Sequence, residues 1–328
     1  MPTPAVHEFG PSQYHTTLGP HEPVLTVTAG DSIITTCVDA EGGDQSGHRI
    51  GLEQLGGPAG ARQVVSNPLT GPFFVAEAEP GDALVVQLEE VIPTRSWAWS
   101  RNPADFGFFS TEELYGPTNL TPPVWPGKEE RDFRWELDLA ANVGRLALPK
   151  SRVRRAEVPL HPFLGCIGVA PERGETRMTM AAGRHGGNMD CPQVRPGVTV
   201  YVPVFVPGAL LCLGDCHAAQ GDGELCGVAL EVSCRVRFRV EVLKAQSPRW
   251  PRLEDAEHLM AVGNVRPLSA AYAAAHVEII EWLVADWGFD RFEALQLVSQ
   301  VGTARIGNVV DPNYSVVARF PKRYLPEG

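Results

Sequence analysis

Alternating apolar and polar positions recur along most of the chain and predict β-strands. The clearest run extends from Glu231 to Leu243, where apolar residues fill every second position and arginines fill several of the positions between them. Because successive side chains of a strand point to opposite faces, this run predicts a half-buried antiparallel strand. Its arginines are then expected on a solvated or salt-bridged face, and we assign them no function. Shorter strand-like runs lie at 25–28, 33–38, 83–88 and 198–202.

The hydrophobic period changes from two to about 3.6 near the C-terminal end. We expect Ser269 to cap a helix that ends before Gly288, and Asp290 to cap a second helix that ends near Gly302. An alternating strand at 314–320 follows. The residues predicted to share the buried face of the first helix are Tyr272, Ala275, Ile279 and Leu283.

These patterns together predict a mainly β fold with a smaller α/β part, in which a β-sandwich-like core precedes a helix-helix-strand unit. The abundance of turn formers, with 33 glycines and 29 prolines, supports many short strands. We expect an N-terminal arm at 1–22, a β-rich core at 23–245 and an α/β unit at 246–328. An alternative division splits the core into two β subdomains, at 23–150 and 151–245.

Composition narrows the range of partners. The formal net charge is −11, so no global basic field attracts a phosphate backbone, and we expect no nucleic acid partner. The N-terminal residues lack a basic region followed by an apolar one, and no run approaches the length needed to cross a membrane. We therefore expect a cytoplasmic protein without a membrane partner. The seven cysteines form no Cys-x-x-Cys pair, which favours reduced thiols.

Candidate chemistry gathers in the stretch 214–224, which reads GDCHAAQGDGE. In an extended segment Asp215 and His217 would point to the same face, where both could bind one divalent cation. Glycines at 221 and 223 allow a turn that brings Glu224 back toward the same point. A carboxylate in that position could shuttle protons. The same residues also fit an ordinary surface turn, in which an Asp side chain caps the backbone.

The stretch 214–224 resembles the signature of the acetamidase/formamidase family. Five further segments resemble the family in the same order along the chain, and they lie at 67–72, 79–82, 162–171, 186–190 and 310–313. The resemblance covers roughly residues 20 to 322. It implies hydrolysis of a short aliphatic primary amide, such as formamide or acetamide, to a carboxylate and ammonia.

The resemblance also implies a set of metal ligands. We expect Asp215 and His217 to hold a divalent ion, with Asp39 or Asp190 as a further ligand. Asp39 ends a predicted strand before a glycine-rich loop, and Asp190 belongs to the segment 186–190. Mixed carboxylate and imidazole ligands with an open position suit zinc, which we favour as the cofactor.

Three further residues are predicted to act on the substrate. Amide hydrolysis requires an activated nucleophile, stabilisation of the tetrahedral oxyanion and an acid for the departing nitrogen. We expect Glu224 to take the proton of the attacking water and return it to the leaving amine. Asn188 and Gln220 are expected to orient the substrate.

Two alternatives remain open at this point. The first is a thiol amidase with Cys216 as the nucleophile, although neighbours in an extended chain face opposite ways and Cys216 could not readily share a proton with His217. The second is a β-sandwich that binds a metal or small ligand without turnover, because a fold alone does not fix a function.

The segment 95–135 holds an aromatic cluster among prolines and glycines, without a clear period. Its members are Trp97, Trp99, Phe106, Phe108, Phe109, Tyr115 and Trp125. A long non-periodic segment of this kind is typical of a functional loop or lid, or of a contact with another subunit. With the apolar C-terminal unit, it leads us to expect a homo-oligomer.

Overall fold

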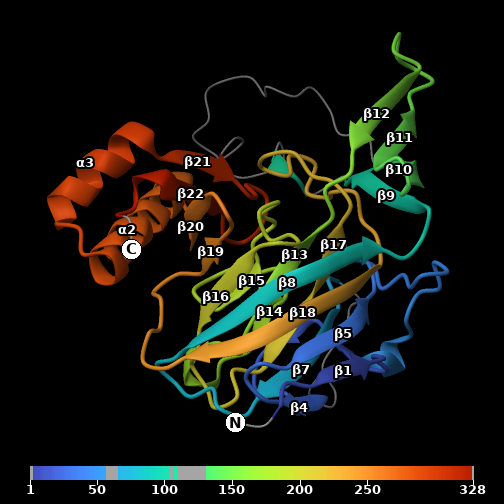
Figure 1. Cartoon of the computed structure of the whole chain (residues 1–328). Coiled ribbons are helices and arrows are strands. Elements are labelled where there is room, and N and C mark those ends of the chain that lie inside the picture. The colour runs from blue at the N-terminus through green and yellow to red at the C-terminus, as the bar shows by residue number, and fades with distance from the viewer. Residues whose placement is uncertain (1–2, 57–65, 104–105, 109–130, 327–328) are drawn as a thin grey trace, which may run out of the picture.

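The computed structural model describes residues 3–56, 66–103, 106–108 and 131–326. Most of its strands belong to two large sheets (Figure 1). The larger sheet has nine strands. In spatial order they are β1 (Val6–Phe9), β5 (Ser32–Cys37), β18 (Cys234–Leu243), β8 (Ala83–Pro93), β16 (Thr199–Pro203), β19 (Arg252–Glu254), β20 (His258–Asn264), β22 (Ser315–Pro321) and β21 (Thr303–Ile306).

The second sheet has seven strands and carries the segments with candidate chemistry. Its strands in spatial order are β15 (Gly186–Asn188), β13 (Phe163–Gly168), β17 (Leu211–His217), β7 (Leu69–Val75), β2 (Tyr14–His15) and β6 (Leu55–Gly56), with β4 (Leu25–Val27) paired to β7. A small ladder joins β3 (Thr17–Leu18) to β14 (Arg177–Met178). Single 3-10 turns lie at Leu52–Gln54, Glu172–Gly174 and Lys322–Tyr324.

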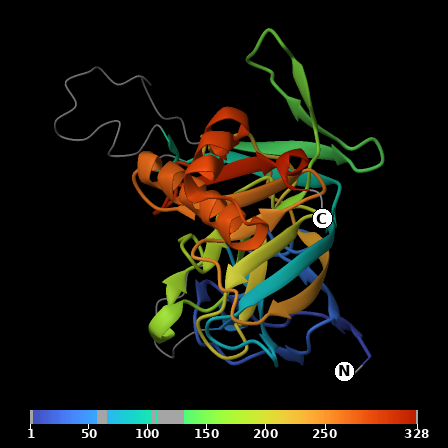
Figure 2. The same cartoon turned by 60° about the vertical axis from the view of Figure 1, so that its left-hand side comes forward.

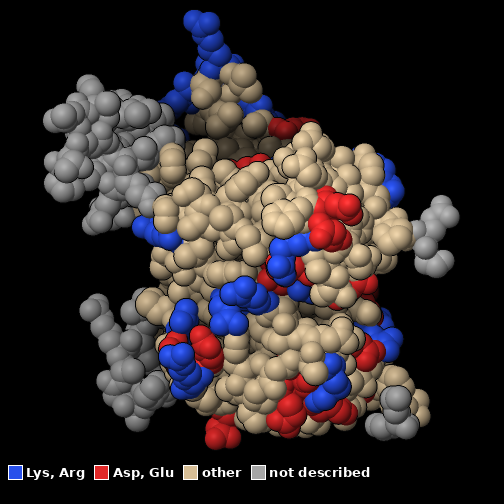
Figure 3. Space-filling view, turned by 90° about the vertical axis from the view of Figure 1, so that its left-hand side faces the viewer, with Lys and Arg blue, Asp and Glu red and all other residues tan. Residues whose placement is uncertain are grey.

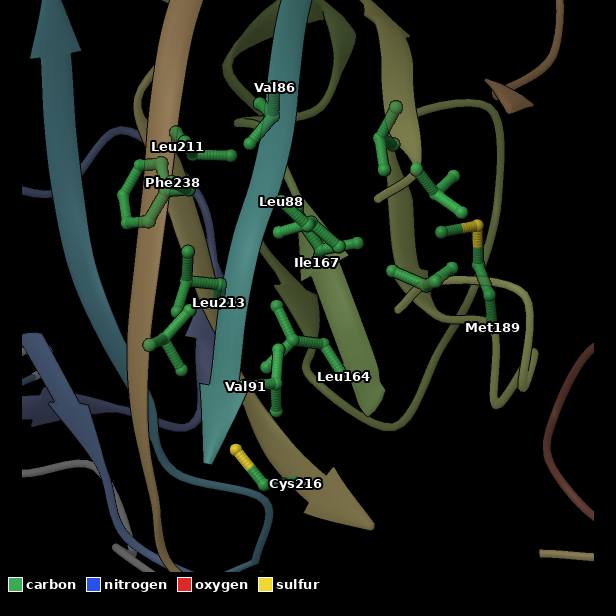
Figure 4. Packing of buried hydrophobic residues seen from close by; sticks show 14 of the residues in the cluster. Val86, Leu88, Val91, Leu164, Ile167, Met189, Leu211, Leu213, Cys216 and Phe238 are labelled. Carbon is green, nitrogen blue, oxygen red and sulfur yellow. The ribbon is translucent and has the colours of Figure 1, made fainter. Parts of the chain in front are cut away.

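The two sheets pack face to face through one apolar core. Figure 4 shows side chains of β8 and β18, such as Val86 and Phe238, against Ile167 of β13 and Leu213 of β17. All four residues are almost completely buried. The packing of two sheets through their apolar faces confirms the predicted β-sandwich core.

β18 confirms the alternation read from the sequence. Its apolar side chains enter the core, and each arginine on the opposite face lies beside a glutamate. The ion pairs are Arg235 with Glu90, Arg237 with Glu89 and Arg239 with Glu241. The strand begins at Cys234 rather than at Glu231, which instead pairs in isolated bridges with Trp99 and His217. This local departure from the ladder becomes important at the site.

A separate four-stranded sheet forms an arm that projects from the sandwich (Figures 1 and 2). Its strands in order are β12 (Arg155–Pro159), β11 (Val143–Ala147), β10 (Arg131–Asp138) and β9 (Trp97–Asn102). The turn between β11 and β12 is rich in basic residues. Figure 3 shows Lys and Arg side chains at the top of the view, where the arm lies.

Two helices cover the C-terminal end of the large sheet: α2 (Leu268–Trp287) and α3 (Arg291–Val301). α2 begins after Pro267 rather than after Ser269, and it ends as predicted at Gly288, whose left-handed φ of 70° closes the helix. The Asp290 side chain accepts from the amides of Phe292 and Glu293, which confirms the second N-cap.

The buried face of α2 differs from the prediction at one position. Ala275, Ile279 and Leu283 are buried, but Tyr272 is 52% exposed and Ala271 takes its place. Residues 271, 275 and 279 are spaced by four, so a residue one position further along points away from that face. On α3, Phe292 is 75% exposed.

α2 is long enough and apolar enough in composition to cross a membrane, contrary to the expectation from sequence, and it is the one helix of the described residues that meets this test. In the structure its buried face packs against β20 and β22. The proposed domain divisions stay predictions. β16 and β19, on either side of residue 245, are neighbours in one sheet.

Candidate active site

The centre of the site lies on β17, where Asp215 and His217 point to the same place. The Nε2 atom of His217 is 3.5 Å from Oδ2 of Asp215. Asp190, which follows β15, completes a group whose candidate ligand atoms all lie within 4.8 Å of one another. β13 lies between β15 and β17, and Cys166 of β13 pairs with Asn188 on one side and Gly214 on the other. This register brings the 186–190 segment beside the 214–224 segment.

A second group shares the imidazole and contains Glu224 and Glu231, again with its ligand atoms within 4.8 Å. The Nε2 atom of His217 is 3.3 Å from Oε1 of Glu231. The two groups face a cavity of about 230 Å³, whose lining includes Asp215, His217, Glu224, Glu231 and Asp311. The cavity thus joins carboxylates from distant parts of the chain around one histidine.

Two asparagines hold the carboxylates in place. Asn188 Nδ2 donates to Oδ2 of Asp190 at 2.8 Å and to Oδ2 of Asp311 at 2.7 Å. Asn67 Nδ2 donates to Oδ1 of Asn188 and to Oδ2 of Asp215, both at 3.1 Å. Asn188 also lines the cavity, and its amide group orients two carboxylates there.

The hydrogen bonds of Gln220 fix the tautomer of His217. Gln220 Nε2 donates to the carbonyls of Asp190 and Gly307, at 2.8 and 3.0 Å, so Oε1 faces Nδ1 of His217 at 2.9 Å. An amide oxygen can only accept, and Nδ1 must therefore carry a proton. The lone pair of the neutral imidazole is then on Nε2, which faces the carboxylates, as in histidines that bind metals.

Replacing Gln220 with Leu is therefore expected to lower kcat/KM by about 10- to 100-fold, because the imidazole loses the acceptor that orients it. The change should also weaken the binding of divalent metal, measured by titration of metal-free protein. Gln193→Leu is a matched control, since the amide oxygen of Gln193 has no hydrogen-bond partner in the part of the chain that the structure describes. Equal activity of the two variants would contradict the role of Gln220.

Three buried carboxylate oxygens in the cluster have no hydrogen-bond partner among the described residues: Oδ1 of Asp190, Oδ1 of Asp215 and Oε2 of Glu231. Unpaired buried charge is costly, and such groups are normally paired or bind a cation. Oxygen and imidazole ligands of this kind suit a divalent ion. The residues present therefore fit a metal site.

Burial and crowding shift the pKa values of the cluster. Burial raises the pKa of Asp190 well above its usual range, and the carboxylates of Glu224 and Asp311 add to the shift. Burial also raises the pKa of Glu231 to about 8, although His217 opposes it. For His217 itself burial lowers the pKa, but the nearby carboxylates outweigh burial and raise it. The cluster thus retains protons readily unless another positive charge is present.

The backbone is strained at four residues of the site. Asn67, Asp190, Asp215 and Glu224 have φ values of 44°, 46°, 53° and 49°. Residues other than glycine seldom adopt this left-handed conformation, which persists only where the surrounding structure enforces it. Such positions cluster at functional sites, and here they coincide with the candidate ligands and the predicted proton shuttle.

Asp39 has different neighbours from the other predicted ligands. Its Oδ2 accepts from Arg95 at 2.6 Å and from Nε1 of Trp99 at 3.0 Å, and its Oδ1 accepts from the Gly43 amide at 2.7 Å. Among the described residues it belongs to neither group of candidate ligands. Its assignment as a ligand remains a prediction, which this buried ion pair does not favour.

Cys216 lies on the opposite face of β17 from Asp215 and His217. Figure 4 shows it in the apolar core near Val91 and Leu164. Its side chain is completely buried, and burial raises the pKa of the thiol well above its usual value. A thiol in this position is a packing residue, so the geometry contradicts the alternative in which Cys216 is the nucleophile.

Sequence reasoning missed Glu231, Asn67 and Asp311 as members of the site, as well as Asn308, whose Nδ2 donates to Oδ2 of Asp190 at 3.1 Å. Asn67 and Asp311 lie in segments that resembled the family, but neither was given a role. Glu231 looked like one polar position in an alternating strand. The feature that could have indicated its role is a single carboxylate between Leu230 and Val232, ahead of the arginines of the strand.

The aromatic segment contributes part of the cavity wall. Trp99 and Phe106 line the cavity, as do Arg101 and Pro103. Phe109, Tyr115 and Trp125 lie outside the described residues, and the choice between a lid and a subunit contact stays a prediction.

Comparison with known proteins gives a consistent set of matches. Residues 173–325 match the model of the acetamidase/formamidase family. The crystal structure of an acetamidase from Yersinia enterocolitica superposes with a TM-score of 0.82 at 34% identity, covering 99% of this chain and 94% of that one. An acetamidase structure from Bacillus halodurans gives a TM-score of 0.78 at 25% identity, covering 97% and 98% of the two chains.

Curated sequences match over shorter lengths. A formamidase of Methylophilus methylotrophus is 27% identical over 273 residues, which cover 71% of this chain and 64% of that protein. A Schizosaccharomyces pombe protein named as a formamidase matches 54% of this chain and 52% of its own length. The chain therefore spans between half and two thirds of the length of these curated relatives.

Proposed function

Because the chain belongs to the acetamidase/formamidase family, we propose that it hydrolyses short aliphatic primary amides, such as formamide and acetamide, to a carboxylate and ammonia. The observation that carries this proposal is the buried group of Asp190, Asp215 and His217 beside a cavity of about 230 Å³. The buried carboxylates of the cavity lining offer polar contacts for an amide, and the strained backbone of the site holds them in place.

We further propose that Asp190, Asp215 and His217 hold a divalent ion, with zinc favoured. The unpartnered oxygens of the two aspartates and the Nε2 lone pair of His217 support this assignment. When bound, such an ion supplies Lewis acidity toward the amide carbonyl and a water. Asn188 and Gln220 then act by orienting the ligands, which revises the direct contact with substrate expected for both.

Glu224 is the proposed proton carrier. It lines the cavity and is 8% exposed. Burial raises the pKa of its carboxyl group well above the usual range. A carboxylate with such a raised affinity for protons can take a proton from the attacking water and return it to the departing nitrogen. Oε1 of Glu231 lies 3.3 Å from Nε2 of His217, beside the proposed metal site.

Chelation tests this function. Ammonia release from formamide, acetamide and propionamide is measured before chelation, after it, and after zinc is restored, with metal content determined in parallel. We expect turnover to fall at least 100-fold without metal and to recover with it, because chelation would remove the ion that Asp190, Asp215 and His217 are proposed to hold. Full turnover by protein shown to be metal-free would refute metal dependence. Absence of turnover on every amide, in metal-loaded protein, would refute amide hydrolysis.

We also propose that the protein forms a homo-oligomer through the arm. The arm projects from the sandwich (Figure 2), and among the described residues no strand pairs with the outer edge of β12. The turn 148–155 carries four basic residues, whereas the chain as a whole has a net charge of −11, so the arm and the surface of another copy attract each other. Light scattering that gave the monomer mass of 35.6 kDa at micromolar concentration would argue against this proposal.

A further inference from the structure

The cavity is larger than acetamide requires, and we propose that its preferred substrates are amides with a neutral, apolar acyl group bulkier than acetyl. This inference rests on the amide hydrolysis proposed above and specifies its substrate class. At about 30 Å³ for each water-sized group, the four non-hydrogen atoms of acetamide occupy roughly half of the space. The cavity measures about 230 Å³. Two to four further carbons fill the remaining space, which corresponds to an acyl group of four to six carbons in total.

The added space is bordered by apolar side chains. Phe106, Met180 and Val228 line the same cavity as the carboxylates and His217, and all three are half-buried. They offer an acyl chain a surface from which water is displaced on binding. Each methylene transferred from water to such a surface is expected to raise kcat/KM about fourfold.

Two of these side chains are held by their neighbours. The ring of Phe106 lies against Gly227, where an added Cβ would come within 2.4 Å of the ring. Met180 Sδ accepts a hydrogen bond from Oγ of Ser66 at 3.2 Å. The apolar wall is therefore part of the folded structure, and it does not depend on a loose side chain entering the cavity.

The charges around the cavity favour a neutral acyl group. Arg101 is the one Lys or Arg among the described lining residues, and it is paired with Glu41 at 2.6 Å and with Asp132 at 2.5 Å. The lining also contains four carboxylates at the site, Asp215, Glu224, Glu231 and Asp311. An acyl group that ends in a carboxylate therefore meets no unpaired Lys or Arg side chain among these lining residues, and the loss of its hydration is not compensated.

Two amides of the same shape test the proposal on the wild-type protein. 4-Methylpentanamide and succinamate differ in their ends, an isopropyl group in one and a carboxylate in the other. We expect kcat/KM for 4-methylpentanamide to be at least tenfold higher than kcat/KM for acetamide. It should be at least 100-fold higher than kcat/KM for succinamate. If kcat/KM for acetamide were higher than kcat/KM for 4-methylpentanamide, this inference would be overturned and the proposed function would stay intact. Failure on all amides, acetamide included, would instead overturn the proposed function.

A pair of variants tests the wall itself. Val228→Phe places a larger side chain in the cavity, and it should lower the ratio of kcat/KM for 4-methylpentanamide over acetamide at least tenfold. Val277→Phe makes the same change on α2, where Val277 is 48% exposed, and should leave the ratio unchanged. Circular dichroism of both variants checks the fold. An unchanged ratio in folded Val228→Phe protein would show that the acyl group does not contact this wall.

Discussion

Replacing Glu224 with Gln is expected to lower kcat for amide hydrolysis by about 100- to 10,000-fold, the range usual for loss of a general acid or base. The substitution keeps the size of the side chain but removes its capacity to take up a proton. Glu224 faces the cavity, and burial raises the pKa of its carboxyl group. Because the proposed ligands are Asp190, Asp215 and His217, metal content should remain close to that of the wild type.

The control for this variant lies two residues away. Asp222 is paired with Arg305 on the surface, at 2.7 Å, and its side chain is 41% exposed. Asp222→Asn removes a carboxylate from the same loop without reaching the cavity, and its kcat should stay within a few fold of the wild type. Steady-state kinetics on acetamide compares the two. Comparable rates for Glu224→Gln and the wild type would eliminate Glu224 as the proton carrier.

Gly165→Ala is expected to lower kcat/KM at least 100-fold, although glycine itself takes no part in the chemistry. A Cβ at this position would lie 2.6 Å from Oδ2 of Asp215 and 2.7 Å from Oδ1 of Asp190. Both carboxylates must then move, and a displacement of about 1 Å at a reacting centre can cost a factor of 100. The variant should also bind less metal, measured by elemental analysis after dialysis.

Gly10→Ala is the matched control, because nothing lies within 4 Å of its added Cβ. Thermal unfolding of both variants separates loss of the site from loss of the fold. If Gly165→Ala retained wild-type metal content and turnover, Asp190 and Asp215 would not be the ligands that the proposed function requires.

Local patterns predicted the elements well, because they depend on neighbours in sequence. The alternation of β18, the N-cap at Asp290 and the shared face of Asp215 and His217 all follow from spacings of a few residues. The error at Tyr272 has the same origin, since a one-position shift of the helical face moves a residue into solvent.

Long-range pairing could not be read from those patterns. Glu231 enters the site because its segment forms bridges with Trp99 and with His217, and nothing near Glu231 in the chain indicates either partner. Asp39 was expected at the metal, but Arg95 satisfies its charge from a strand-connecting segment 56 residues away. Asn188 and Gln220 were selected by resemblance and their roles stay predictions, whereas their hydrogen bonds to the proposed ligand residues needed the three-dimensional structure.

The order of strands in the large sheet also constrains when the protein can fold during synthesis. β5 pairs with β18, which follows it by about 200 residues, a distance over which loop closure is entropically costly. The other neighbour of β5 is the edge strand β1. Residues Cys234–Leu243 must therefore be synthesised before β5 has a strand on both sides. Until then the apolar face of β5 and its unpaired backbone remain open to other chains. Nascent chains of this protein therefore depend on protection from aggregation for most of their translation.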